Sequence, residues 1–336
     1  MKEALFYKKL EQKQVKCFLC NHNCLIALDN FGRCRVRQNK NGSLYSLNYG
    51  EVVAANIDPI EKKPFFHFLV GSVSFSIACV GCNFSCDFCQ NWEISQEKEA
   101  KKLNIKTNLV TPDEIINLAL KANCPSISYT YTEPTIYFEF AFDCCKLAKQ
   151  KGLKNAFVTN GYISKDSLEY ISAYLDAANV DLKSFNEDFY KKICKATLKP
   201  VLENIILMKR LNIWVEVTTL LIPGLNDSKQ ELKKIAEFLV SVDKNLPWHI
   251  SAFHPDYKLT NIQATEFTSL KIAYQIGKEA GLNYVYIGNV YSEFENTYCP
   301  ACNKLLIERR GFFILQNNAI GGKCRYCGFE ISGIGL

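Results

Sequence analysis

The stretch Ser72–Cys89, which reads SVSFSIACVGCNFSCDFC, joins a short β-rich run to a cysteine-rich loop. Residues 72–79 have the length and composition of a buried strand, and we expect one there. Cys82, Cys86 and Cys89 follow at a C-x3-C-x2-C spacing. Because they stand in a loop, no helix geometry holds their thiols apart. The stretch therefore predicts a metal centre at the carboxyl end of a strand.

Further β-rich runs follow, and helical patterns separate them. They are SISYTYT (126–132), NAFVT (155–159), ANVDL (178–182), WVEVTTLLI (214–222), WHISAF (248–253) and YVYIG (284–288). Most run starts are about 23 to 36 residues apart, the length of one strand and one helix. We expect an α/β fold whose parallel sheet forms a partial (β/α)6-type TIM barrel. Active sites of such sheets lie at the carboxyl ends of the strands, which places the cysteine loop at the mouth.

Helix boundaries are also marked in the sequence. The segment 111–114, Thr-Pro-Asp-Glu, places a capping residue, a proline and two acids before EIINLALKA, where a helix would begin. Asp227 and Ser228 precede KQELKKIAEFLVSV in a similar way. Gly281 follows a third helical pattern and predicts its end.

The composition suits one large core with small appended modules, because the chain has 336 residues of which 48% are hydrophobic. The first residues, MKEALFYKKLEQKQVK, have no apolar core, and no run of about 18 apolar residues occurs. We therefore expect a cytoplasmic protein without a membrane span. The formal charge of +6 counts every thiol as neutral, whereas metal-bound thiols are deprotonated. The basic balance therefore does not indicate a nucleic-acid partner.

Sixteen cysteines are unusual in a reducing compartment unless many of them bind metals. Twelve fall into three clusters, within residues 17–34, 79–89 and 299–327. The remaining cysteines stand in apolar or helical contexts, and we expect them to be small core residues. They are Cys124, Cys144, Cys145 and Cys194.

The spacing of Cys82, Cys86 and Cys89 suits a [4Fe-4S] cluster whose fourth iron has no protein ligand. Zinc is the alternative, because a structural zinc site takes four ligands and Cys79 precedes Cys82 by three residues. Cys79 ends an apolar run, which favours packing in the core or a place beside the cluster. The sequence therefore favours iron and sulfide over zinc at this loop.

These residues resemble the cluster motif of the radical S-adenosylmethionine (radical SAM) superfamily, which has an aromatic residue before its last cysteine, here Phe88. The resemblance implies cleavage of SAM to a 5′-deoxyadenosyl radical that abstracts hydrogen from a substrate, with Phe88 packed near the adenine. Glu133 and Pro134 stand where the superfamily has Gly-Gly-Glu-Pro, which implies a carboxylate for the SAM amino group. Tyr131 and Thr132 replace both glycines. The resemblance therefore does not extend to the backbone contacts that the two glycines make with SAM.

Polar residues also end the third and fourth strands. Asn160 stands in a Thr-Asn-Gly segment, where superfamily members place residues that contact the ribose or the methionine of SAM. Asp181 and Lys183 belong to an Asp-Leu-Lys segment found in the pyruvate formate-lyase activating enzyme group, and this implies that Asp181 helps to hold a monovalent cation. A second aspartate of that group is Val158 here. A turn role for Asn160 and an ordinary ion pair for Asp181 are the alternatives.

The sixth strand ends in HISAFHPDY (249–257), which brings His249, His254, Asp256 and Tyr257 toward the mouth. Side chains of these types bind substrates, transfer protons or quench radicals. We therefore expect His254, Asp256 and Tyr257 to be catalytic. A structural, hydrogen-bonded histidine is the alternative for His254.

With its flanks included, the chain resembles the radical SAM component of the AmmeMemoRadiSam system. The similarity lies in DPIEKKPFFHFLVGS (58–72), CQNWEIS (89–95), YTYTEPTIYFE (129–139) and HISAFHPDYK (249–258). It implies AMMECR1-like and Memo-like protein partners, and an electron donor such as flavodoxin or ferredoxin. Activation of a glycyl radical enzyme is the second interpretation. A multi-zinc binding or scaffold protein is the alternative from another class.

Two four-cysteine modules flank the predicted barrel. The C-terminal one consists of two C-x2-C knuckles, which predict a zinc-ribbon or rubredoxin-like module. Its ligands would be Cys299, Cys302, Cys324 and Cys327. Zinc and iron both accept four sulfurs in tetrahedral geometry, and structural zinc is our expectation.

The N-terminal module has a less regular spacing and suits zinc or an auxiliary [4Fe-4S] cluster. Its ligands would be Cys17, Cys20, Cys24 and Cys34, with His22 as an alternative. We favour zinc, because Arg35 stands where a ferredoxin-type motif has proline. The expected organisation is an N-terminal module with a β element over 1–70, a radical SAM barrel over 71–295 and the C-terminal module over 296–336.

Overall fold

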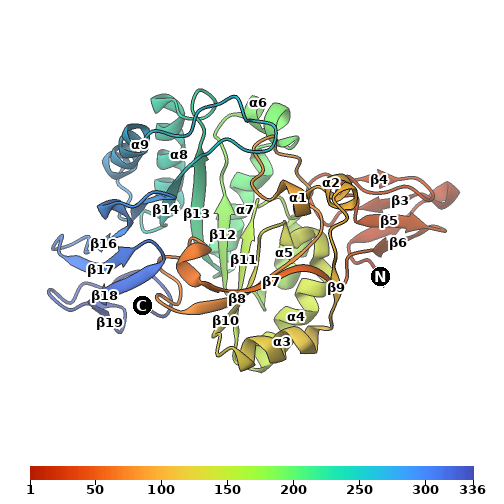
Figure 1. The fold of residues 1–336 in the computed structure, drawn as a ribbon, viewed down its shortest axis with the longest axis horizontal. Coiled ribbons are helices and arrows are strands. Elements are labelled where there is room, and N and C mark those ends of the chain that lie inside the picture. The colour runs from red at the N-terminus through yellow and green to blue at the C-terminus, as the bar shows by residue number, and fades with distance from the viewer.

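The computed structural model describes residues 1–336 and has a nine-stranded sheet at its centre (Figure 1). The strands lie in the order β15-β14-β13-β12-β11-β10-β8-β7-β9. Those from β8 to β15 are β8 (Val73–Cys79), β10 (Ser126–Tyr129), β11 (Lys154–Thr159), β12 (Ala177–Asp181), β13 (Trp214–Leu221), β14 (Trp248–Ala252) and β15 (Val285–Gly288). All neighbours among these strands pair in parallel. The predicted strands and the α/β class are therefore confirmed.

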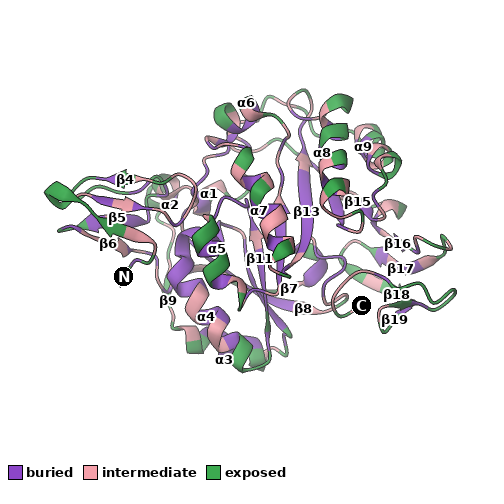
Figure 2. Ribbon diagram, turned by 180° about the vertical axis from the view of Figure 1, so that it is seen from behind, coloured by how far each residue is buried: buried purple, intermediate pink, exposed green.

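Helices connect the parallel strands and lie together on one face of the sheet, behind it in Figure 1 and before it in Figure 2. They are α3 (Pro112–Lys121), α4 (Phe138–Gln150), α5 (Lys165–Ser172), α7 (Lys199–Arg210), α8 (Lys229–Val242) and α9 (Phe267–Ala280). Shorter segments are α1 (Trp92–Ser95), α2 (Glu97–Lys102), α6 (Glu187–Phe189), η1 (Glu11–Lys13), η2 (Ile60–Lys62), η3 (Pro134–Tyr137), η4 (Tyr190–Cys194) and η5 (Glu293–Glu295). The helices bury an apolar stripe against the strands and expose the opposite side (Figure 2).

The predicted helix boundaries are confirmed in atomic detail. Thr111 and Glu114 form a reciprocal capping box at the start of α3. The hydroxyl of Ser228 accepts a hydrogen bond from the backbone N–H of Glu231 at the start of α8. Gly281 ends α9 with φ at 106°, a left-handed conformation that glycine adopts without a steric penalty.

The N-terminal module lies at one end of the molecule (Figure 1). It has two small sheets, from β1 (Lys2–Glu3), β6 (Ser43–Ser46) and β5 (Arg37–Lys40), and from β2 (Tyr7–Lys9), β3 (Val15–Cys17) and β4 (Leu25–Ile26). The next strand, β7 (Glu51–Pro59), pairs antiparallel with β8 and with β9 (Asn108–Leu109). The range 1–70 therefore contains a strand of the central sheet.

A buried ion pair joins the N-terminal module to helix α4, which packs on the central sheet. The guanidinium of Arg37 on β5 donates to both carboxylate oxygens of Glu139 on α4, at 2.8 and 3.3 Å. Their side chains are only 2% and 1% exposed. Leu5 completes the contact, because its N–H donates to Glu139 and its carbonyl accepts from Arg37. The two parts are thus held together by charge as well as by apolar packing.

The C-terminal module lies at the opposite end (Figure 1). It contains β16 (Thr297–Tyr298), β17 (Leu305–Arg310) and β18 (Phe313–Asn317) in one sheet, and β19 (Ala319–Ile320) with β20 (Lys323–Cys324) in another. The chain then returns to segment 60–69, where Ile334 forms a parallel bridge with Phe68. The Ile334 N–H donates to the carbonyl of His67, and the Ile334 carbonyl accepts from Leu69.

The segment 60–69 fills the amino-terminal part of the sheet's inner face. Ile60, Phe65 and Phe68 are fully buried and pack against Ala156 of β11 and Ala177 of β12. Because this end is filled, the carboxyl ends of the strands are left for the cysteine loop. No helix is both long and apolar enough to cross a membrane.

Candidate active site

The central cysteine loop begins directly after β8 and ends at α1. Segments distant in sequence fix its backbone. The N–H groups of Ser85 and Asp87 donate to the carbonyls of Cys194 and Ile193 in η4, both at 3.2 Å. From another side, the Lys258 N–H donates to the carbonyl of Asp87 at 3.1 Å. The fold therefore defines the position of the loop before any ligand binds.

Hydrogen-bond donors surround two of the loop's thiols. The Sγ of Cys82 accepts from the backbone N–H of Phe84 at 3.3 Å and lies 3.8 Å from Nδ2 of Asn160. The Sγ of Cys89 lies 3.1 Å from the hydroxyl of Ser95. Burial, and then the carboxylate of Glu133, raise the pKa of the Cys82 thiol. Hydrogen bonds to the sulfurs are one means by which proteins adjust iron–sulfur ligands.

Cys86 has a different environment. A hydrogen bond from Cys194 and the nearby ammonium of Lys183 lower the pKa of the Cys86 thiol, although burial opposes them. Lys183 Nζ pairs with Asp181 at 2.9 Å and lies 5.6 Å from the centre of the Phe88 ring. The ordinary ion pair considered for Asp181 is therefore present. Cys194 was not expected beside the loop from the sequence, because only the folded chain brings η4 to it.

Glu133 lies where β10 and β11 end, and it is only 2% exposed. Its carboxylate accepts from the backbone N–H of Thr135 at 3.0 Å, the backbone N–H of Asn160 at 2.8 Å and the hydroxyl of Thr159 at 2.8 Å. Burial raises the pKa of Glu133, and these hydrogen bonds oppose the rise. Asn160 in turn donates to Oδ1 of Asn83 in the cysteine loop at 2.7 Å. Glu133, Asn160 and the loop thus form one hydrogen-bonded unit.

Tyr131, which replaces a glycine of the superfamily pattern, has the left-handed backbone that glycine favours, with φ at 62°. Its hydroxyl donates to Asp58, and Nδ2 of Asn56 donates to that hydroxyl at 3.2 Å. Lys63 Nζ lies 4.1 Å from the ring centre and pairs with Asp58 at 2.7 Å. Burial lowers the pKa of Lys63 to about 8.

The residues that follow strand β14 contact the end of the cysteine loop. Nε2 of His254 lies 3.0 Å from the side-chain amide of Gln90. The Trp92 indole N–H donates to Asp256 at 3.3 Å, and Tyr257 stacks on Trp92 with ring centres 5.2 Å apart. The structure therefore brings His254, Asp256 and Tyr257 to the loop, where they hold the segment after Cys89.

The expectation that His249 lies near the mouth is wrong. His249 is the second residue of β14, and its Nε2 lies 2.7 Å from the carboxylate of Glu216, deep in the amino-terminal part of the sheet. Glu216 also accepts from the backbone N–H groups of Phe66 and His67. His67 lies 2.6 Å from the hydroxyl of Tyr286. Strand alternation points His249 to the inner face of the sheet, as expected. Its position near the start of β14, however, places it at the amino-terminal end of the sheet, which we call the floor.

This floor network makes stability depend on pH. Burial lowers the pKa of His67 to about 4 from 6.5. Between these values the unfolded chain binds a proton that the folded chain does not, so the free energy of unfolding should fall as the pH falls, by up to about 1.4 kcal/mol per pH unit. The free energy of unfolding should be measured in urea at several pH values across this interval. It should change less steeply with pH in His67→Gln than in the wild type. Equal slopes would contradict the assignment.

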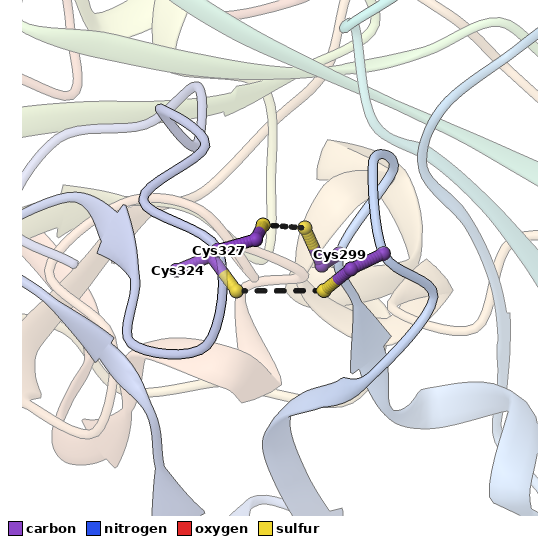
Figure 3. A group of neighbouring side chains, drawn as sticks. Cys299, Cys324 and Cys327 are labelled. Carbon is purple, nitrogen blue, oxygen red and sulfur yellow. Dashed lines mark hydrogen bonds between the residues drawn. The ribbon is translucent and has the colours of Figure 1, made fainter.

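The C-terminal cysteines form a compact ligand set (Figure 3). The sulfurs of Cys299 and Cys327 are 3.7 Å apart, and those of Cys302 and Cys324 are 3.8 Å apart. All four sulfurs lie within 4.8 Å of one another. A tetrahedral site with metal–sulfur distances of about 2.3 Å gives sulfur–sulfur distances of about 3.8 Å, so the geometry fits one metal ion.

The N-terminal cysteines Cys17, Cys20, Cys24 and Cys34 line one small cavity. Its walls also include His22, Arg37 and Asn83. Among the remaining thiols, Cys79 is fully buried in the core. The core assignment of Cys124, Cys144, Cys145 and Cys194 is confirmed, since none is more than 2% exposed.

Comparison with known proteins agrees with this geometry. Residues 76–239 match the radical SAM superfamily. An uncharacterized protein of Methanocaldococcus jannaschii is 48% identical, over 98% of this chain and 99% of its own length. A second protein of that organism, named for glycyl-radical enzyme activation, is 30% identical over 55% of this chain and 71% of its own length. The solved structure of Streptococcus suis SuiB bound to S-adenosylmethionine shares the fold, with a TM-score of 0.50, 12% identity, and coverage of 66% of this chain and 50% of that chain.

The chain therefore belongs to the radical SAM superfamily. It is an enzyme, so the alternative of a purely structural scaffold is wrong. Membership implies a [4Fe-4S] cluster and SAM as cofactors.

Proposed function

We propose that Cys82, Cys86 and Cys89 bind three irons of a [4Fe-4S] cluster at which SAM is cleaved, and that the resulting radical abstracts hydrogen from a bound substrate. The carrying observation is that a single loop presents three thiols beside the Glu133–Asn160 unit. The chemistry of this donor set fits the cluster, because Phe84 N–H and the hydroxyl of Ser95 contact the cysteine sulfurs. When bound, the cluster and SAM supply one-electron cleavage to methionine and a 5′-deoxyadenosyl radical.

The neighbouring residues would bind and orient SAM. Glu133 offers a buried carboxylate for the amino group of SAM. Asn160 lies close enough to Cys82 to contact the methionine or ribose part of SAM. Phe88 is buried and would pack near the adenine. Asp181 is more exposed than Glu133 and pairs with Lys183, so a cation there would have to share this carboxylate.

The substrate would enter from the side of His254, Asp256 and Tyr257. Asp256 and Tyr257 fix Trp92, which follows the cysteine loop, so their first task is to hold the rim of the site. His254 is exposed and free to move a proton at Nε2 when Gln90 releases it. On the inner face, the Tyr131–Asp58–Lys63 group offers a phenol and an ammonium to polar parts of a substrate.

The partial (β/α)6 barrel over 71–295 and the two flanking modules stay our proposal for the domain organisation. The same holds for membership of the AmmeMemoRadiSam system, with AMMECR1-like and Memo-like partners and a flavodoxin or ferredoxin as donor. For the C-terminal module we propose structural zinc, because the sulfur spacing suits a single tetrahedral ion. Activation of a glycyl radical enzyme is the second candidate, favoured by the relative named for that activity.

The first experiment measures SAM cleavage. Anaerobically reconstituted protein, incubated with SAM and dithionite, should form 5′-deoxyadenosine and methionine, quantified by liquid chromatography. Protein without added iron and sulfide is the control. If reconstituted protein forms no more 5′-deoxyadenosine than this control, the proposed function is wrong.

A second measurement separates the two candidate reactions. Activation of a glycyl radical enzyme predicts a glycine-centred EPR doublet on a protein substrate. A small-molecule reaction predicts that deuterium moves from the labelled molecule into 5′-deoxyadenosine.

A further inference from the structure

The N-terminal cavity differs from the C-terminal metal site in the spacing of its sulfurs. All four N-terminal cysteines line the cavity. Within residues 1–336, however, only the C-terminal cysteines form a set of three or more ligand atoms that lie within 4.8 Å of one another. One tetrahedral zinc needs sulfurs about 3.8 Å apart. A cubane binds each thiolate to a different iron, so its sulfurs lie farther apart. The N-terminal sulfurs therefore lack the close spacing that one tetrahedral zinc needs.

Two residues that line the cavity each carry a buried hydrogen-bond donor without a partner. The donors are Nε of Arg37, a residue 1% exposed, and Nδ2 of Asn83, a residue also 1% exposed. Unpaired buried donors are costly and point to an acceptor that completes them. A [4Fe-4S] cluster brings sulfide acceptors and a net negative charge with its four thiolates. Zinc with the same four thiolates has a similar net charge, but it offers only the thiolate sulfurs as acceptors and adds no sulfides.

The cavity shares a wall with the central cysteine loop. Asn83 lines the cavity and directly follows Cys82 in the loop. Nε2 of His22, which lies between Cys20 and Cys24, is 2.8 Å from the carbonyl of Asn83. A hydrogen-bonded path of a few residues therefore connects the N-terminal thiols to a proposed ligand of the SAM cluster.

We infer that Cys17, Cys20, Cys24 and Cys34 bind an auxiliary [4Fe-4S] cluster, which passes electrons to the central cluster along the His22–Asn83 contact. This reverses the preference for zinc drawn from the sequence, and its second part rests on the proposed function. A ferredoxin or flavodoxin gives one electron to the auxiliary cluster, which changes from the 2+ to the 1+ state. The same electron then moves to the central cluster, and the auxiliary cluster returns to 2+.

The metal assignment is tested without the central cluster. A Cys82→Ala/Cys86→Ala/Cys89→Ala variant, reconstituted anaerobically, should retain about four irons and four sulfides per chain. Its reduced form should give a [4Fe-4S] EPR signal that SAM does not alter. Adding Cys20→Ser should remove this iron, whereas adding Cys124→Ser, a buried core thiol, should not. Two zincs per chain and no iron would overturn the inference, whether or not the wild type cleaves SAM.

The electron path is tested with His22→Phe, which retains a ring beside Tyr162 but loses the contact to Asn83. Iron content and the dithionite-reduced EPR spectrum should match the wild type. Reduction of the central cluster by reduced flavodoxin, followed by rapid-freeze EPR, should slow several-fold. An unchanged rate would overturn the proposed electron transfer along the His22–Asn83 contact. The assignment of the auxiliary cluster would then rest on the iron content alone.

Discussion

Replacing Cys82 by alanine is expected to reduce 5′-deoxyadenosine formation to the level of a protein-free control. In the proposed function, three thiols of one loop bind the cluster, so that each one removed would leave an iron without its protein ligand. The loss should appear as a fall of about four irons per chain relative to the wild type. Formation that continues undiminished in Cys82→Ala would exclude this residue as a ligand.

Cys79→Ala is the matched control for this experiment. Cys79 is a neighbouring thiol that is fully buried at the end of β8. Its loss removes only a small core side chain, so iron content and SAM cleavage should be retained. If Cys79→Ala loses metal as completely as Cys82→Ala, the loop instead binds a metal through four thiolates, as a closed zinc site would.

The largest loss of stability is expected from Glu139→Ala. This change leaves the guanidinium of Arg37 buried without its carboxylate, in a position only 2% exposed. Removing one partner of a buried pair typically costs about 3–5 kcal/mol. The shift should be measured as the change in the free energy of unfolding in urea, with the metal sites loaded.

Two variants complete this test. Glu169→Ala removes the exposed pair with Lys165, whose side chains are 71% and 44% exposed, and should cost less than about 1 kcal/mol. Arg37→Met/Glu139→Leu removes both charges and should recover part of the loss. A Glu139→Ala effect no larger than that of Glu169→Ala would show that the pair does not hold the module to α4.

Local patterns predicted the parallel strands and the C-terminal cysteine group that could bind a metal ion. Each strand is a short β-rich run between helices with marked ends, and such signals depend on neighbouring residues alone. The place of Glu133 and Asn160 followed from the rule that parallel strands meet at their carboxyl ends. These residues could therefore be assigned to one site before their contacts were known.

Contacts between distant segments could not be predicted in this way. His249 was misplaced because alternation reveals the face of a strand but not the depth along it. The side chain of Tyr131 contacts Asp58 and Lys63, which come from a different strand and turn. Likewise, the contact of His22 with Asn83 joins two motifs 61 residues apart.

The return of the chain to the barrel floor affects how the enzyme is made. His67 is hydrogen-bonded to Ser332, 265 residues later, and Ile334 pairs with Phe68 beside it. During synthesis, the aromatic side chains of segment 60–69 emerge long before these partners. We expect the floor to close last, so that a nascent chain exposes Phe65 and Phe68 and depends on chaperones until residue 334 has been added.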